Sequence, residues 1–255
     1  MISKIKTSLG VLKLMKNYPT YFRDYLKLID KKYLLYKLRN GIKYKVRAKT
    51  TDRFIINEIW IHNSYTPKGF EIKESDTVLD IGAHIGVFSI FASHLSKNGK
   101  VYSFEPFQEN FNLLKDNINL NETKNIIPIN KAISNKNSKQ SLFISESENK
   151  GSGSLHQNNN SKKVTIEAIS LQSFLKEYKI KTIDFLKIDC EGAEYEILYN
   201  CPKNLLQKIK KISMEYHNLS KENNGSALKK FLEENGFAVT LIPEKKRGTI
   251  YAKLI

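Results

Sequence analysis

The run Val-Leu-Asp-Ile-Gly-Ala-His-Ile-Gly at positions 78–86 constrains the fold more than any other part of the sequence. It joins a short apolar strand to a turn of small residues that opens a helix. Glycine lets a ligand approach the backbone closely, and the first amides of a helix are free to bind it. In open α/β sheets, ligands bind at the carboxyl ends of the strands beside such a turn. The run therefore predicts a ligand site at Gly82 and Gly86.

An acidic residue follows at the distance expected for a ribose contact. Glu105 ends the next apolar run, 25 residues after Asp80, and folds that bind dinucleotides place such a residue on the ribose diol. Three residues separate Gly82 from Gly86, so the middle glycine that pyrophosphate requires is missing. No Gly-Lys-Ser/Thr follows, which excludes a phosphate loop. A ribose cofactor without pyrophosphate remains, and S-adenosylmethionine is the common one, although Asp80 and Glu105 could instead simply cap turns.

Short apolar strands alternate with helical stretches from residue 77 onward, which predicts βαβ units and a parallel sheet. We place one α/β domain at 75–255, with a polar inserted hairpin or loop at 134–163 whose tip we expect to be mobile. Residues 1–74 form a basic cap that we do not expect to be a second catalytic unit. We expect helices to about residue 40, broken near Pro19, and then a hairpin at the Asn40-Gly41 turn.

The positive charge is concentrated at the start of the chain. Residues 1–50 hold 14 Lys or Arg and 2 Asp or Glu, which is +12 of the net +16. Such a segment could bind an anionic membrane surface, a nucleic acid or an acidic glycan, or it could be a solvated helical surface that binds nothing. No apolar run has the length of a signal peptide or a membrane span, and two cysteines cannot form a disulfide framework. We expect a soluble cytoplasmic protein, with peripheral contact at the inner membrane surface as an alternative.

Three ordered motifs resemble the FkbM-type methyltransferases. They are DTVLDIGAHIGVFSIFAS, KVYSFEPFQENFNLLKDNINLN and FLKIDCEGAEYEIL. The resemblance implies a Rossmann-like class I methyltransferase sheet, with seven strands of which the last is antiparallel, preceded here by the basic extension. It also implies an S-adenosylmethionine-dependent enzyme.

The resemblance further implies which residues contact S-adenosylmethionine. The turn after the first strand would hold its methionine part, through Asp80, Gly82, Ala83, His84 and Gly86. Glu105 would bind both ribose hydroxyls, and Asn130 and Ala132 would lie near the adenine. His84 stands where the family more often has asparagine, which leaves the detail of that contact open.

Two pairs of side chains are candidates for the chemistry. Methyl transfer is an in-line displacement in which the protein positions the acceptor and removes its proton. Asp189 and Glu191 follow one predicted strand, and Glu215 and His217 end the next; alternate residues of a strand share a side, so each pair is expected to converge. We predict His217 or Asp189 as the general base. An Mg²⁺ site at Asp189 and Glu215 is a weaker alternative.

The expected acceptor is a hydroxyl of a sugar, a glycan or a related small molecule. Nucleic-acid methyltransferases that act on amino groups would show an Asn/Asp-Pro-Pro-Tyr/Phe run after the fourth strand, and cytosine-carbon enzymes a Pro-Cys pair. This sequence has Asp-Cys-Glu-Gly at 189–192 instead, so nucleic acid is disfavoured as a substrate. Two further functions compete with this prediction: a non-catalytic adaptor that uses the basic segment, and a nicotinamide oxidoreductase.

Overall fold

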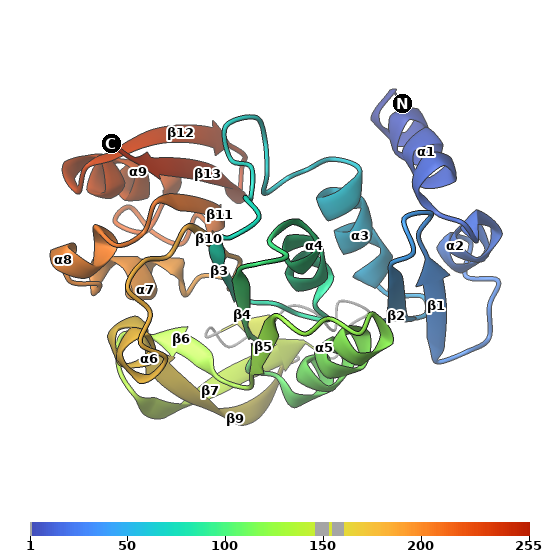
Figure 1. The fold of residues 1–255 in the computed structure, drawn as a ribbon, viewed down its shortest axis with the longest axis horizontal. Coiled ribbons are helices and arrows are strands. Elements are labelled where there is room, and N and C mark those ends of the chain that lie inside the picture. Colours follow the sequence, from blue (N-terminus) through green and yellow to red (C-terminus); the bar gives the residue numbers. More distant parts are fainter. Residues whose placement is uncertain (1, 146–152, 155–160) are drawn as a thin grey trace.

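A computed structural model describes residues 2–145, 153–154 and 161–255, and its centre is a seven-stranded sheet (Figure 1). The strand order is β12-β13-β11-β10-β3-β4-β5. The strands are β3 (Thr77–Ile81), β4 (Lys100–Phe104), β5 (Ile126–Ile129), β10 (Phe185–Ile188), β11 (Lys211–His217), β12 (Phe237–Pro243) and β13 (Arg247–Leu254).

The sheet is parallel except for one strand, β13, which lies between β12 and β11. β13 runs antiparallel to both β11 and β12, whereas β3, β4, β5, β10 and β11 are mutually parallel. The prediction of seven strands with the last one antiparallel is confirmed. β10 is buried along its whole length and β3 along nearly all of it, as expected for strands covered on both faces. The chain order reverses at β3, which places the ligand crevice of such a sheet at its carboxyl end.

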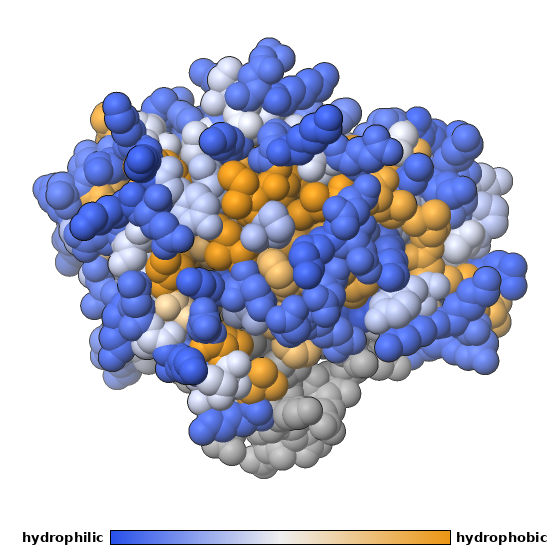
Figure 2. Space-filling view, turned by 60° about the horizontal axis from the view of Figure 1, so that its bottom comes forward, coloured by the Kyte–Doolittle hydropathy of each residue, from blue (hydrophilic) through white to orange (hydrophobic). Residues whose placement is uncertain are grey.

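Helices cover both faces of the sheet. They are α4 (Val87–Leu95), α5 (Gln108–Leu120), α6 (Leu171–Glu177), α7 (Glu194–Tyr199), α8 (Lys203–Leu206) and α9 (Gly225–Glu234). One apolar core joins the sheet to α6, α7, α8 and α9, and a second joins it to α4, α5 and the N-terminal segment. Along β3 the side chains alternate between them, since Val78 packs in the second core and Leu79 in the first. The outer surface is mostly hydrophilic, but hydrophobic residues gather in the middle of the face shown in Figure 2.

A second, four-stranded sheet contains the predicted insertion. Its order is β6-β9-β7-β8, with β6 (Ala132–Ser134), β7 (Ser138–Ser145), β8 (Gly153–Ser154) and β9 (Ser161–Ser170). β7 and β9 form the expected antiparallel hairpin, but β9 extends to Ser170 and pairs in parallel with β6, so the inserted unit is larger than 134–163. The expected mobile tip falls on 146–152 and 155–160, outside the described residues.

The N-terminal segment contains α1 (Ile2–Leu14), α2 (Tyr18–Tyr25), β1 (Tyr33–Lys37), β2 (Lys43–Arg47) and α3 (Asp52–Trp60). The predicted helix break before Pro19 and the Asn40-Gly41 hairpin turn are confirmed, and Gly41 has a φ of +92°. The expectation of helix up to residue 40 is wrong, because residues 33–37 pair with β2 along their full length. This pairing outweighs the helical preference of the leucines and lysines there.

Asn117 of α5 and Asn121, the residue that follows this helix, fasten the outer edge of β2 to the main domain. Asn117 accepts a hydrogen bond from the Lys45 N–H at 2.6 Å and donates to the Lys45 carbonyl at 3.1 Å. Asn121, one helical turn further, makes the same pair of bonds with Lys43 at 2.8 and 2.7 Å. The two side-chain amides thus bond the edge of β2 in the way that a neighbouring strand would. They fix the hairpin on α5.

Replacing Asn117 with alanine should therefore destabilise the protein. Asn117 is fully buried and also donates to the Ile85 carbonyl, so its loss leaves three backbone groups without partners. We expect N117A to lower the free energy of unfolding by about 1–3 kcal/mol in urea denaturation. Asn119, on the exposed side of the same helix, is the control. A loss as large in N119A would show that the effect comes from the helix and not from the bonds to β2.

Candidate active site

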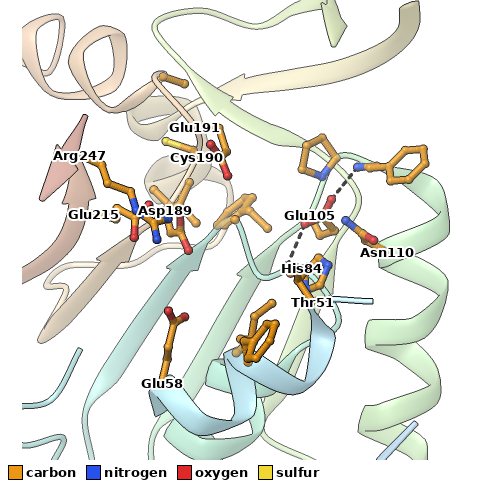
Figure 3. Close-up of a pocket in the computed structure, with 18 of the residues that line it drawn as sticks. Thr51, Glu58, His84, Glu105, Asn110, Asp189, Cys190, Glu191, Glu215 and Arg247 are labelled. Carbon is orange, nitrogen blue, oxygen red and sulfur yellow. Dashed lines mark hydrogen bonds and ion pairs between the residues drawn. The ribbon is translucent and has the colours of Figure 1, made fainter. Parts of the chain in front are cut away.

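A cavity of about 870 Å³ opens at the carboxyl ends of the central strands. Several parts of the chain form its wall, among them the four-stranded sheet and α7. The turns after β3 and β4 contribute residues such as Gly82, His84 and Glu105, the loop after β10 contributes Asp189, Cys190 and Glu191, and the N-terminal segment closes the cavity from the outside. In Figure 3, Glu105 and His84 lie on one side, and Asp189, Glu215 and Arg247 lie on the other.

Glu105 is held firmly by two backbone amides at one side of this cavity. Its Oε2 accepts a hydrogen bond from the His84 N–H at 2.8 Å, and its Oε1 accepts one from the Phe107 N–H at 2.9 Å. Only 6% of the residue is exposed, and desolvation raises the pKa of its carboxyl to about 7 despite these bonds. Two carboxylate oxygens provide about four acceptor positions. Glu105 therefore keeps capacity for further donors such as a ribose diol.

His84 connects the cofactor turn to the N-terminal segment. Its backbone is left-handed, with φ at +53°, and its Nε2 lies 2.7 Å from Arg47 Nη2. Arginine always donates, so Nε2 accepts and the ring is neutral with its proton on Nδ1. Burial is the main cause that lowers the pKa of His84 to about 4, and Arg47 adds to it while Asp52 opposes it. Arg47 in turn holds Asp52 through two oxygens, at 2.9 and 3.0 Å, and donates to Asn110 on α5.

The structure divides the predicted cofactor residues into two groups. Four line the cavity, namely Gly82, His84, Glu105 and Ala132. The other four, Asp80, Ala83, Gly86 and Asn130, support the turns around it. Gly86 has a φ of +85° and packs against Leu114 so closely that a Cβ would clash. Asn130 donates to the carbonyls of Glu105 and Pro106 and so fixes the strand end behind the carboxylate.

A buried ion pair joins β3 to β10 below the cavity. Lys187 Nζ lies 3.1 Å from Asp80 Oδ1 and donates to the Gly82 carbonyl at 2.7 Å. Asp80 is fully buried and also accepts from the Ser89 hydroxyl at 2.6 Å. Burial lowers the pKa of Lys187, but the charges of Asp80 and Asp189 outweigh it and raise the pKa above its usual value. Asp80 therefore holds the lysine and the turn, away from the cavity wall.

Asp189 lies at the end of β10, next to Gly82. A Cβ on Gly82, whose φ is +78°, would overlap the Asp189 carbonyl, so only glycine fits. Asp189 Oδ2 accepts from the buried Tyr65 hydroxyl at 2.9 Å and lies 3.8 Å from Lys187. The prediction that Asp189 and Glu191 share a side by strand alternation is wrong in its reason, because β10 ends at Ile188 and Glu191 has a φ of +51°. Both residues nevertheless line the cavity.

His217 is surrounded by carboxylates. Its Nδ1 lies 3.1 Å from Glu194, and its Nε2 lies 3.3 Å from Glu191 and 3.4 Å from Glu215. Burial lowers the pKa of His217, but the bonds to these carboxylates outweigh it and raise the pKa to about 12. The ring is therefore an imidazolium at neutral pH and cannot accept a proton. It is also absent from the cavity wall, so the structure argues against His217 as the base.

The expected Mg²⁺ site finds no support. Within residues 2–145, 153–154 and 161–255, no group of three or more His, Cys, Asp or Glu is placed to hold a metal ion. Asp189 is bonded to Tyr65, and Glu215 is bonded to Arg247 at 2.8 Å. Both carboxylates are thus engaged by protein donors.

The N-terminal segment forms more of the site than the sequence suggested. Its helices supply a largely apolar stretch of the cavity wall, with Val11, Tyr21, Phe22, Tyr25, Phe54 and Ile55. It also supplies Glu58, whose carboxylate points toward Asp189 and Glu215 (Figure 3). Nothing in the sequence of α3 marks Glu58, because a single acidic residue on an amphipathic helix usually faces solvent.

Comparison with known proteins decides the family. The methyltransferase FkbM domain matches residues 80–239. The chain belongs to the FkbM methyltransferase family. It is an S-adenosylmethionine-dependent methyltransferase with the class I fold.

Relatives of this FkbM methyltransferase are distant. Methyltransferase sdnD of Sordaria araneosa is 23% identical over 231 residues, which cover 78% of this chain and 87% of that protein. Hexuronic acid methyltransferase AglP of Haloferax volcanii is 26% identical over 147 residues, 58% of each chain. The crystal structure of an FkbM methyltransferase from Methylobacillus flagellatus shares the fold, with a TM-score of 0.51 at 15% identity over 76% of this chain and 50% of that one.

The pH dependence of stability should reveal the neutral His84. The folded FkbM chain does not protonate this ring until about pH 4, whereas an ordinary histidine does so near 6.5. Between these values the unfolded chain binds more protons, so acid favours unfolding. The variant H84N tolerates the left-handed backbone and does not titrate. As the pH falls from 6.5 to 4, the free energy of unfolding of the wild type should decrease relative to H84N, by at most about 1.4 kcal/mol per pH unit. If urea denaturation gives the same difference in free energy of unfolding between wild type and H84N at every pH from 6.5 to 4, a neutral His84 is contradicted.

Proposed function

We propose that this FkbM methyltransferase transfers a methyl group to a hydroxyl of a sugar, a glycan or a related small molecule. The observation that carries the proposal is the single cavity that joins the cofactor turn at Gly82 and Glu105 to the carboxylates of Asp189, Glu191 and Glu215. A hydroxyl is a weak nucleophile until a base removes its proton. Carboxylates beside the cofactor provide for this, and they would repel a nucleic-acid backbone. Among the relatives whose names state a substrate, the 31-O-demethyl-FK506 methyltransferase supports an oxygen acceptor, and the hexuronic acid methyltransferase supports a sugar-type acceptor.

The residues present fit S-adenosylmethionine. Glu105 keeps acceptor capacity for the ribose hydroxyls, and Gly82 exposes backbone at the cavity wall. We propose that His84 and Ala132 complete this contact surface and that Asp80, Ala83, Gly86 and Asn130 hold its shape. The cofactor would supply the methyl group on a positively charged sulfur. Asp189, Glu191 and Glu215 would favour this charge by simple attraction.

Among the predicted catalytic residues, we propose Asp189 as the one that contacts the acceptor. It lines the cavity beside Gly82, and Tyr65 and Lys187 hold its position. We propose that Asp189 orients the acceptor hydroxyl, because a carboxylate that already accepts from a phenol can accept from a second hydroxyl. Glu191 and Glu215 would act through their negative charges, without contact to the acceptor. His217 keeps these two in place as their cationic partner.

The basic segment provides a surface suited to peripheral contact with an anionic membrane. Ile5, Leu9 and Leu12 of α1 are exposed, and Lys6 and Lys13 are exposed beside them on the same helix. An interfacial helix combines apolar and cationic side chains in this way. No helix among the described residues is long and apolar enough to cross a membrane. We infer that α1 contacts an anionic membrane surface. This contact is independent of the proposed methyl transfer.

Calorimetric titration with S-adenosylmethionine, and separately with NADH, tests the cofactor proposal. We expect binding of S-adenosylmethionine alone, and a loss of affinity of about tenfold to a hundredfold in E105A, because the ribose diol loses its buried acceptor. The control E109A removes a carboxylate from α5 that does not line the cavity. Equal binding by E105A and wild type would contradict the role of Glu105, and binding of NADH alone would contradict the enzyme class.

Sedimentation with vesicles tests the membrane contact. Vesicles that contain phosphatidylserine should bind the wild-type protein, and those of pure phosphatidylcholine should not. The double variant K6E/K13E should lose most of this binding, since each cation near such a surface contributes about 1 kcal/mol. The double variant K229E/K230E on α9 serves as a control of equal charge change. Similar loss in both would show a general charge effect without a contact through α1.

A further inference from the structure

The described part of the cavity wall contains several carboxyl side chains, and all except one have a protein partner. These carboxyls are Glu58, Glu105, Asp189, Glu191, Glu196 and Glu215. Glu105 accepts from backbone amides, Asp189 from Tyr65, Glu196 from the Ser134 hydroxyl at 2.6 Å, Glu191 pairs with His217 and Glu215 with Arg247. Within the described residues, the Glu58 carboxylate has no hydrogen bond and no ion pair. Among the carboxyls of the described wall, it is the one whose acceptor positions are all left for a ligand.

Glu58 lies on the acceptor side of the cavity. It projects from α3, in the last turn before Trp60, toward Asp189 and Glu215 (Figure 3). Asp189 follows β10 and Glu215 belongs to β11, so Glu58 faces the strand ends where the chemistry of this fold occurs. The side chain is exposed to the cavity rather than packed in a core. Its conformation is therefore not required by the packing of α3.

We propose that Glu58 is the general base of the methyl transfer. This inference rests on the proposed function, since it names the group that activates the acceptor. The acceptor oxygen forms a bond to the methyl carbon, and the carbon–sulfur bond breaks with its electron pair left on sulfur. The hydroxyl proton moves to a carboxylate oxygen of Glu58 and is later released to water. Charge is balanced, because the sulfonium becomes a neutral thioether as the carboxylate becomes a neutral acid.

The electrostatic surroundings of Glu58 suit this task. Protein atoms around the carboxyl desolvate it, and the negative charges of Asp189 and Glu215 oppose its ionisation, which together raise the pKa of Glu58 to about 7. Arg247 and Lys187 act in the opposite direction and do not outweigh these effects. A base works best when its proton affinity matches the operating pH. An ordinary carboxylate, by contrast, binds a proton too weakly to be an effective base near neutral pH.

The remaining candidate bases are each committed to another partner. His217 is already protonated at neutral pH, and Glu215 is bonded to Arg247. Asp189 accepts from Tyr65 and lies beside the Lys187 ammonium. These contacts suit Asp189 to orient the acceptor hydroxyl, and Glu58 then accepts its proton. The N-terminal segment would thus contribute a catalytic residue to the domain that binds the cofactor.

Carbon-13 NMR of protein labelled at the glutamate carboxyl carbons tests the proton affinity directly. We expect two carboxyl signals to titrate near pH 7, one from Glu58 and one from Glu105. Glu58→Gln should remove one of them, and saturating S-adenosylmethionine should shift the other. If the signal that Glu58→Gln removes titrates with the ordinary carboxyls, near pH 4.5, the proposal is overturned, and this holds without any knowledge of the acceptor.

A transfer assay supplies the second readout. The methyl glycosides of glucose, mannose, galactose and rhamnose serve as probe acceptors, with methyl-labelled S-adenosylmethionine. Wild-type transfer should rise as the pH increases through 7, because only ionised Glu58 accepts a proton. Glu58→Gln should reduce transfer about a hundredfold or more and remove this pH dependence, while Glu109→Gln should behave as the wild type. Unchanged transfer and pH profile in Glu58→Gln would overturn the proposal, and if no glycoside accepts a methyl group the NMR titration decides alone.

Calorimetry separates this inference from the proposed function. Glu58→Gln should bind S-adenosylmethionine with an affinity within a few-fold of the wild type, because Glu58 faces the acceptor side of the cavity. Failure of the wild type to bind S-adenosylmethionine would contradict the proposed function itself. Normal binding by both proteins, with an ordinary titration of Glu58, would leave the function intact and reject only the role of Glu58 as the base.

Discussion

The buried ammonium of Lys187 is the contact on which the site depends most. It is 4% exposed, and it bonds the Gly82 carbonyl, pairs with Asp80 and lies near Asp189. These groups belong to the two neighbouring strands β3 and β10 and to the turns that follow them. A buried charge is tolerated only where opposite charges and hydrogen bonds surround it, so the lysine requires both turns to keep their conformation. The turn after β3 and the loop after β10 are thereby held as one unit.

The N-terminal segment is part of this unit. It is therefore more than the cap that the sequence predicted. Arg47 and Asp52 bring it against His84, and Asn117 and Asn121 fasten its hairpin to α5. The arrangement carries a local cost, since His84 has a left-handed backbone and its buried Nδ1–H lacks a partner among the described residues. A glycine at this position would avoid both costs. The bond to Arg47 gives His84 a function in joining the segment to the cofactor turn, and the same segment presents its own side chains to the cavity.

The negative charges of the cavity are unevenly distributed and only partly balanced by protein cations. Carboxylates gather where the ends of β10 and β11 meet α3, and protein cations neutralise several of them individually, as Arg247 does for Glu215. Glu58 has no such partner, and its raised pKa of about 7 reduces the negative charge of the cavity, because the carboxyl keeps its proton until near neutral pH. Like charges that share a confined space separate their proton affinities in this manner. A positively charged methyl donor and an uncharged hydroxyl are both compatible with this balance.

The sequence alone determined the sheet, the glycine turn after its first strand and the family resemblance, because these depend on local periodicity and on glycines where a side chain would clash. It also placed Gly82, Glu105 and Asp189 at strand ends, which meet at one edge of any parallel sheet. The tertiary structure decided which groups surround each side chain. It turned residues 33–37 into a strand, enclosed His217 among three carboxylates and brought Glu58 and Tyr65 to Asp189. Protonation and hydrogen bonding depend on neighbours that are distant in the chain, and these neighbours exist only once the chain has folded.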